Sequence, residues 1–193
     1  MVDDPDLTST RADAREVARA QGDYRGLHLP EPAPAHRGWH SRLDAVLLED
    51  ELRIEGSGLL VRFPMSDMVL ASYCSDPRGA LRVDLLDGGH VCIRLRDQGQ
   101  LMECLRHQIW EYEKSLVGDC SDIDWALDVS PAQLAEAEVA MDAADARMRA
   151  SGSSLTEDRV AQDLVARSIE LRREARVDAL RRRRQRMRSR TDA

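Results

Sequence analysis

The stretch from Arg42 to Leu116 reads RLDAVLLEDELRIEGSGLLVRFPMSDMVLASYCSDPRGALRVDLLDGGHVCIRLRDQGQLMECLRHQIWEYEKSL. Apolar and charged residues alternate over short runs within it, as in Leu52-Arg53-Ile54-Glu55 and Leu81-Arg82-Val83-Asp84-Leu85. A period of two residues is the pattern of a β-strand that buries one face. The stretch therefore predicts a ladder of short antiparallel strands.

Turn residues separate these runs and set the expected strand boundaries. The turns are expected at Glu49-Asp50, at Gly56-Ser57-Gly58, at 76–79 and, as a hairpin, at Asp87-Gly88-Gly89. The strands expected between them cover residues 44–48, 51–55, 59–63, 65–73, 81–85 and 91–96.

An amphipathic helix is expected to close the ladder. Asp97 with Gln100 forms a plausible start signal, and Gly118 a stop signal. Side chains at helical spacing form one stripe that faces a core: Leu101, Cys104, Leu105, Gln108, Ile109 and Tyr112.

This order of short strands, tight turns and a final helix resembles the bacterial pleckstrin-homology-like (PH-like) domains. The resemblance covers about residues 42–117 and is carried by four segments: 47–54, 63–68, 84–91 and the helix 98–116 with Trp110. It implies a small antiparallel β-barrel or sandwich capped by a C-terminal helix. It also implies a binding function, since such domains take lipid head groups, peptides or partner proteins.

The charge of the first hairpin turn distinguishes between these classes of ligand. PH-like domains that bind head groups place basic residues around this turn, whereas here it is Glu49-Asp50-Glu51. Three carboxylates repel an anionic phosphate. The resemblance therefore favours a protein partner for this module.

The segments on either side of the module have different compositions. Residues 1–38 are expected to be an extension in which 8–20 form a short helix and the prolines at 30, 32 and 34 an extended linker. Residues 118–129 form an acidic connector with Ile123, Trp125 and Leu127, which either fold back onto the protein or dock in a partner's groove.

A helical hairpin is expected over residues 130–180. Ser130-Pro131-Ala132-Gln133 and Ser154-Leu155-Thr156-Glu157 are both capping-box sequences. In the first helix, Leu134, Met141 and Met148 repeat every seven residues, and Ala137 and Ala144 fill the intermediate positions of a narrow seam. The larger apolar residues are expected to carry this seam and to mediate protein interaction: Leu134, Met141, Met148, Val160, Leu164 and Leu171. Trp125 of the connector joins this set of candidate protein-interaction residues.

An arginine-rich tail is expected at 181–193, although the chain as a whole carries a net charge of −7. The candidate anion-binding residues are Arg172, Arg173, Arg176, Arg181, Arg182, Arg183, Arg184, Arg186, Arg188 and Arg190. Their target is nucleic-acid phosphate, an anionic membrane, or acidic groups of a partner or of the protein itself. The alternative is a solvated helix end. Since 172–190 contain no aromatic residue, nucleic-acid binding would be unspecific and sensitive to salt.

No constellation of residues predicts catalysis, a cofactor or a metal. Cys74, Cys92, Cys104 and Cys120 lack metal-ligand spacing and are expected to be reduced thiols. His36 and His40 are four residues apart but follow a proline-rich segment, so ordinary loop histidines are expected. The acidic start lacks the features of a secretory signal, and no apolar run approaches the roughly 20 residues of a membrane span.

These observations predict an α+β protein with a PH-like β domain at 39–117 and an α-helical hairpin extension. All but one of its 28 Lys and Arg residues are arginine, as in a bacterium or phage with a GC-rich genome. The function expected is that of a non-enzymatic, cytoplasmic adaptor that binds a protein partner or itself. Nucleic-acid association through 172–190 is the first alternative, and peripheral association with an anionic membrane is the second.

Overall fold

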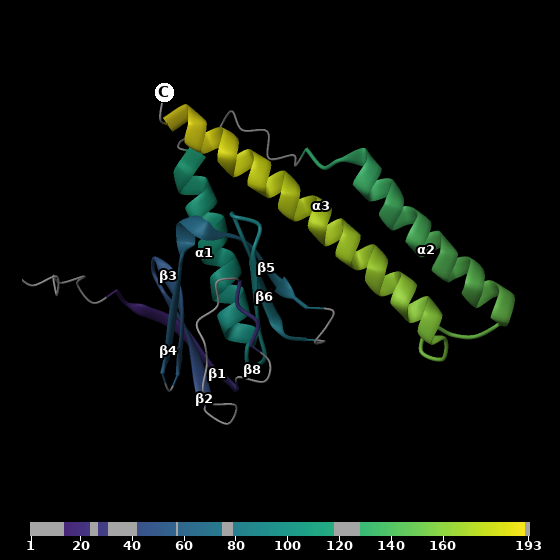
Figure 1. The fold of residues 1–193 in the computed structure, drawn as a ribbon, viewed down its shortest axis with the longest axis horizontal. Helices are drawn as coiled ribbons and strands as arrows, with labels where there is room; N and C mark the ends of the chain where they lie inside the picture. Colours follow the sequence, from purple (N-terminus) through teal and green to yellow (C-terminus); the bar gives the residue numbers. More distant parts are fainter. Residues whose placement is uncertain are drawn as a thin grey trace, which may run out of the picture.

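A computed structural model describes residues 14–23, 27–30, 42–56, 58–74, 79–117 and 128–191. These residues form an α+β protein with two antiparallel sheets and three helices, which confirms the expected class (Figure 1). The strands are β1 (Glu16–Asp23), β2 (Arg42–Leu48), β3 (Glu51–Gly56), β4 (Leu59–Pro64), β5 (Met68–Tyr73), β6 (Leu81–Leu85), β7 (His90–Ile93) and β8 (Leu95–Arg96). The helices are α1 (Gly99–Val117), α2 (Pro131–Ser151) and α3 (Arg159–Thr191).

The larger sheet has the strand order β4-β3-β2-β1-β8. Its central hairpin follows the expected turn at Glu49-Asp50, with Leu47 of β2 opposite Leu52 of β3. The side chains of Leu47, Leu52 and Ile54 are fully buried. Arg53, which lies between Leu52 and Ile54 in β3, is half-buried. The alternation in the sequence therefore defines the buried face of this sheet correctly.

Strand β1 corrects the expected helix over residues 8–20 in the part that the structure describes; residues 8–13 lie outside the described ranges. Residues 16–23 are extended and pair with β2 on one side and β8 on the other. Ala18 and Ala20 are buried, whereas Arg19 between them is exposed, which is the period of a strand. The segment assigned to an N-terminal extension thus supplies an inner strand of the larger sheet.

The smaller sheet has the strand order β5-β6-β7, so β5 is one of its edges. Two expected strands are shorter than predicted. Met65–Asp67 form a 3-10 turn before β5, and a break at Arg94 separates β7 from β8, which belongs to the other sheet. The strands of the described residues therefore form two sheets and do not close into one barrel.

Helix α1 packs between the sheets, as the predicted stripe requires (Figure 1). It begins at Gly99 and not at Asp97, which has a positive φ of 50°. Leu101, Leu105 and Ile109 are buried in the core. Cys104 and Tyr112 are partly buried against it. The amphipathic pattern thus identifies the correct helix and its correct face.

Helices α2 and α3 form the expected antiparallel hairpin, and its seam agrees with the prediction at Ala137 and Ala144 but not at the larger residues. The buried residues between the helices are small and repeat every seven positions: Ala137 and Ala144 in α2, with Ala161, Ser168 and Ala175 in α3. Small side chains allow the two backbones to approach closely. The Ser168 hydroxyl even donates a hydrogen bond of 2.7 Å to the carbonyl oxygen of Ala137 in the opposite helix.

The larger apolar residues predicted to carry the seam flank these small residues instead. Leu171 is buried, and Met141, Met148 and Leu164 are half-buried. Leu134 and Val160 are 38% and 48% exposed. The seven-residue repeat was thus recognised correctly, but the larger apolar residues were wrongly assigned to its centre.

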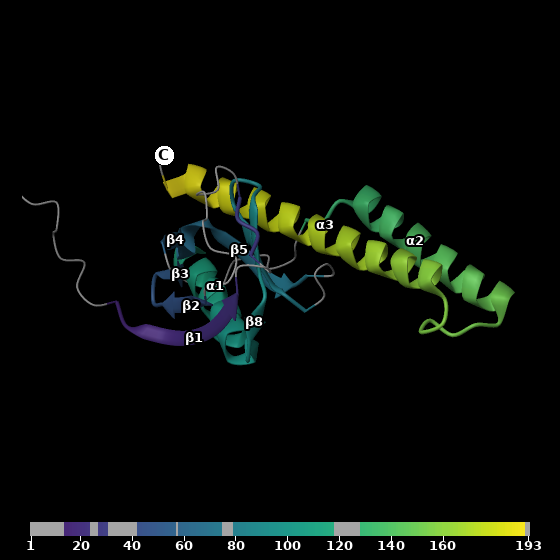
Figure 2. The same cartoon turned by 60° about the horizontal axis from the view of Figure 1, so that its bottom comes forward.

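Helix α3 contains 33 residues and extends to Thr191, so the arginine-rich segment from 181 onward is a helix. At a rise of 1.5 Å per residue the helix is about 50 Å long. Its first half pairs with α2 and projects beyond the sheets, while its second half lies across them (Figures 1 and 2). One helix therefore joins the hairpin to the β domain.

The two predicted capping boxes differ in outcome. Ser130 precedes α2, but its side chain makes no capping hydrogen bond. Ser154 donates both its backbone N–H and its hydroxyl to Glu157 Oε2, which is one half of a capping box, in a turn before α3. The helix itself is capped by Asp158, whose Oδ1 accepts hydrogen bonds from the backbone N–H groups of Val160 and Ala161.

Several predictions concern residues outside the described ranges, namely Trp125 and the connector around it, the linker prolines 32 and 34, Cys120, His36 and His40. The three described cysteines, Cys74, Cys92 and Cys104, are free thiols. None of the described helices is long and apolar enough to cross a membrane.

Candidate functional site

Helix α3 is attached to the β domain by ion pairs of its arginines from Arg173 onward. Arg173 contacts Asp84 of β6 at 2.7 Å, and Asp84 is almost fully buried. Arg173 also donates to Glu170 one turn earlier in α3, which holds the pKa of that carboxyl below its ordinary value. Arg82 of β6 contacts both Asp84 and Glu170. These four side chains form a network between α3 and the smaller sheet.

A second attachment is centred on Glu113 of α1. Its Oε2 lies 2.6 Å from Arg183, and its Oε1 lies 3.4 Å from Arg184. The Arg184 guanidinium also lies over the Tyr112 ring and donates to the backbone carbonyl of Ser66. Glu113 and Arg184 are only 4% and 0% exposed. A buried charge of this kind is tolerated because it is paired and hydrogen-bonded.

The ten candidate arginines are thus divided into groups. Arg173, Arg183 and Arg184 contact buried carboxylates, and Arg181 donates to the carbonyl of Leu85. Arg172, Arg176, Arg182 and Arg186 are exposed, and Arg182 donates to the carbonyl of Asp128. The side chains of Arg188 and Arg190 lie outside the described part of the structure.

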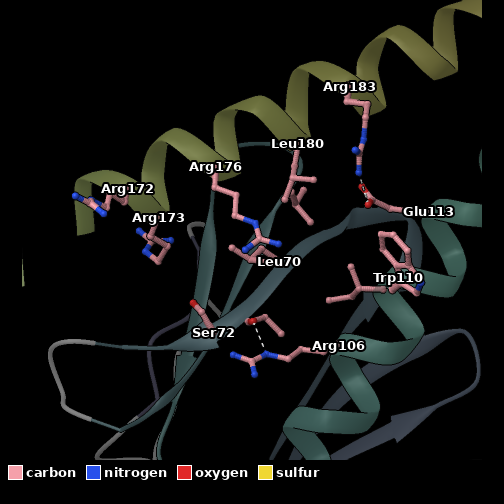
Figure 3. Close-up of a pocket in the computed structure, with 13 residues that line it drawn as sticks. Leu70, Ser72, Arg106, Trp110, Glu113, Arg172, Arg173, Arg176, Leu180 and Arg183 are labelled. Atoms are coloured by element: carbon pink, nitrogen blue, oxygen red, sulfur yellow. Dashed lines mark hydrogen bonds and ion pairs between the residues drawn. The ribbon is translucent and has the colours of Figure 1, made fainter. Parts of the chain in front are cut away.

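A groove of about 720 Å³ lies where β5, α1 and α3 meet (Figure 3). Residues 69–72 of β5 line one side of it. The wall from α1 contains Arg106, Ile109, Trp110 and Glu113, and the wall from α3 contains Arg172, Arg173, Arg176, Leu180 and Arg183. Its volume is within the range of sites that hold a small molecule or a few residues of a peptide.

The β5 side of the groove is the edge of the smaller sheet, because β5 pairs only with β6 among the strands that the structure describes. An edge strand presents backbone N–H and C=O groups that can pair with a further strand. One of these groups, the carbonyl of Ala71, already accepts a hydrogen bond of 3.1 Å from Arg106 Nε. A second chain in extended conformation is thus the ligand shape that this edge fits.

The walls of the groove combine apolar and cationic side chains. Trp110 is 43% exposed, and Ile109 and Leu180 lie beside the groove as parts of the buried core. Arg106 stands over the ring of Tyr73 at 5.8 Å, a cation–π contact that helps to fix its direction. Arg172 and Arg176 project from α3, and Arg176 points toward Leu70 of β5 (Figure 3). An extended ligand with acidic and apolar side chains matches these walls.

The sequence-based list of site residues contains Arg172 and Arg176 but misses Arg106, Trp110 and the edge of β5. Trp110 could have been recognised from the sequence, because this large apolar residue lies next to Ile109 but outside the apolar stripe of the helix. No local pattern identifies β5 as an edge, since that depends on the strand order of the whole sheet. The predicted interaction residues Leu134, Met141 and Val160 lie on the hairpin and do not line the groove.

The opposite edge of the smaller sheet carries a pair of histidines. His28 forms an isolated bridge to Cys92 of β7, and its ring stacks on that of His90 with centroids 4.8 Å apart. Burial lowers the pKa of His90 below its ordinary value of 6.5, and the nearby charges of Arg82, His28 and Arg173 lower it further. Asp84 acts in the opposite direction but does not reverse the shift.

This arrangement predicts a loss of stability in mildly acidic solution. The folded state binds a proton at His90 more weakly than the unfolded chain does, so stability falls as the pH drops below about 6.5. We expect the wild-type midpoint of urea unfolding to decrease between about pH 7 and pH 5, before the carboxylates titrate. His90→Gln should show a smaller decrease. Equal slopes for the two proteins would contradict this role of His90.

No protein-family model matches this chain, and no curated protein resembles it in sequence. Within the described residues, no group of three or more His, Cys, Asp or Glu side chains is placed to hold a metal ion. The groove and the arginine contacts around it are therefore the features from which a function is inferred.

Proposed function

We propose that this chain is a non-enzymatic adaptor whose β domain binds an extended, acidic segment of a partner protein. The observation that carries the proposal is the groove at the free edge of β5, with Arg106, Arg172 and Arg176 on its walls. Backbone pairing along β5 would supply affinity, while the side-chain subsites would select acidic and apolar residues.

In this proposal the β domain is a PH-like module in which α3 adds a wall. Two antiparallel sheets packed on a helix support that relationship. A second hollow, of about 440 Å³, lies at the first hairpin turn and is lined by Glu49, Asp50 and Glu111 among other residues. These carboxylates disfavour an anionic lipid head group there, which again supports a protein ligand.

The helical hairpin would be the second contact region of the adaptor. It projects from the β domain and carries exposed apolar side chains, including Val139 and Ile169 at 68% and 56% exposure. A protein that holds one partner in the groove and another on the hairpin would keep them at a distance fixed by α3. This bivalency follows from the continuity of that helix.

The test is direct binding of a fluorescent synthetic peptide in which valine and glutamate alternate. We expect saturable binding to the wild-type protein and little binding of the same peptide with lysine in place of glutamate. Arg176→Glu should weaken binding by about tenfold or more, as expected for reversing one charge near a carboxylate. Arg186→Glu makes the same change on the same helix outside the groove and is the matched control.

Location is tested separately from affinity. In a titration followed by amide NMR signals, the peptide should shift residues of β5, α1 and the middle of α3. Shifts confined to the hairpin or to the acidic turn, or equal losses in both charge-reversal variants, would contradict the proposed site.

Unspecific nucleic-acid binding is the second candidate, because Arg172, Arg176, Arg182 and Arg186 are exposed on one helix. Deleting 172–193 would be a poor test, since it removes the half of α3 that contacts Asp84 and Glu113. Replacing the four exposed arginines with glutamine keeps these contacts. Loss of salt-dependent binding to arbitrary duplex DNA in that variant would favour this candidate. Anionic vesicles provide the corresponding test for membrane association.

A further inference from the structure

We infer that the groove recognises a phosphorylated residue, with a phosphate monoester between Arg106 and Arg176 beside the edge of β5. This inference rests on the proposed function, since it names the chemical group that the same groove selects. Arg106 comes from α1 and Arg176 from α3, and Figure 3 shows both side chains directed toward the stretch of β5 around Leu70 and Ser72.

The charges on the groove are not compensated from within it. Glu113 is the single carboxylate among the described residues that line the groove, and its two oxygens contact Arg183 and Arg184. Arg173 is likewise engaged with Asp84 and Glu170. Among the described residues, Arg172 and Arg176 have no ion pair or hydrogen bond, so their guanidinium groups remain available to an anion.

Arg106 is held in place while part of its guanidinium stays available. Its Nε donates to the Ala71 carbonyl, and its plane stands over Tyr73. Its only carboxylate contact with a described residue is a long one, 3.9 Å between Nη1 and Glu103, whose side chain is 78% exposed. A guanidinium fixed through Nε presents its terminal N–H donors in the fork geometry that matches phosphate oxygens.

A hydroxyl of β5 in the same groove has no partner among the described residues. Ser72 lines the groove, and its Oγ is buried with no hydrogen bond to any described residue. A buried hydroxyl without a partner is unfavourable, and an acceptor oxygen from a ligand would remove that cost after a small side-chain adjustment. The site thus offers O–H and N–H donors and no available carboxylate.

A phosphate monoester fits this set of donors better than a carboxylate does. It carries a charge of about −1.5 to −2 at neutral pH and three acceptor oxygens, so it can engage two guanidinium groups and a hydroxyl together. The free β5 edge and the apolar wall of Ile109 and Leu180 favour a peptide as its carrier over a nucleic acid, which has no strand to pair with that edge.

The experiment compares two synthetic peptides that differ only in one phosphoserine at the centre of the valine and glutamate sequence. We expect the phosphorylated peptide to bind the wild-type protein at least about tenfold more tightly, and inorganic phosphate to compete with it weakly. In Arg106→Gln and Arg176→Gln most of this preference should be lost. Arg186→Gln should retain it, and Arg176→Lys should retain only part. Circular dichroism would verify that each variant is folded.

The outcomes distinguish a failure of the phosphate site from a failure of the proposed peptide-binding function. If both peptides bind equally well, the phosphate site is wrong while the peptide groove stands. If neither binds, both proposals fail. A preference for phosphate that is equal in Arg106→Gln, Arg176→Gln and Arg186→Gln would place the anion elsewhere and overturn the inference. So would displacement of the phosphopeptide by an arbitrary oligonucleotide of equal charge.

Discussion

Replacing Glu113 with glutamine should lower the free energy of unfolding by about 3 kcal/mol or more. Glu113 is 4% exposed and is the carboxylate that pairs with both Arg183 and Arg184. Removing one partner of a buried ion pair leaves the other charge uncompensated, and such changes typically cost about 3–5 kcal/mol. Here Arg184 would keep its contacts with Tyr112 and the Ser66 carbonyl but lose its contact with the Glu113 carboxylate.

Urea unfolding of the full chain measures this loss, and Glu111→Gln provides the control. Glu111 lies on the same helix and pairs with Lys114 on the surface, so its replacement should change the midpoint little. The double variant Glu113→Gln, Arg184→Met should recover part of the loss, because it removes a buried charge as well as its partner. A midpoint for Glu113→Gln close to that of Glu111→Gln would show that the pair does not stabilise the fold.

The same variant should also affect the groove. Glu113 and Arg183 line it, and their contact holds the second half of α3 near α1 (Figure 3). Loosening this attachment is expected to widen the groove and weaken peptide binding even where the protein remains folded. Hydrogen exchange should therefore increase first in α3 beyond Leu180.

The second large effect is expected from Ala144→Leu in the hairpin seam. Ala144 is fully buried between α2 and α3, and α2 makes its main contacts with α3 alone. Three additional carbon atoms at this point must push the helices apart, and overpacking of this kind typically costs about 1–3 kcal/mol. The Ser168 to Ala137 hydrogen bond across the same seam should then be lost as well.

Amide hydrogen exchange would locate the effect. Protection should fall throughout α2 and the first half of α3, while the sheets and α1 should be unchanged. Val139→Leu is the matched control, since Val139 is on the same helix but 68% exposed. Full protection of α2 in Ala144→Leu would mean that the seam can relax, and the close-packing argument would then be wrong.

The parts of the fold that were predicted correctly depend on local patterns. The alternation in residues 51–55 and 81–85 identifies strands and their apolar buried faces, although Asp84 on the other face is buried as well, and the stripe from Leu101 to Tyr112 identifies α1. Both signals arise because a regular backbone places side chains on one face at a fixed period, whatever lies opposite. The hairpin with its seven-residue repeat was predictable for the same reason.

Strand β1 shows where local patterns fail. Its alanines and arginines at 11–20 favour a helix by intrinsic propensity. The strand exists because β2 and β8 supply backbone partners on both sides, and because Gly22 lets β1 pass close to the Arg94 carbonyl, where a Cβ would collide. Pairing with distant strands outweighs a weak helical preference.

The sequence by itself determined that this chain has strands, an amphipathic helix, a helical hairpin and a cluster of arginines. Only the tertiary structure decided what those arginines do. Arg183 meets Glu113 across 70 positions of the sequence, and Arg173 meets Asp84 across 89. Electrostatic contacts and grooves depend on distances in space between side chains from separate elements. The sequence gives the charge of each residue, but it does not show which residues lie next to it in the folded protein.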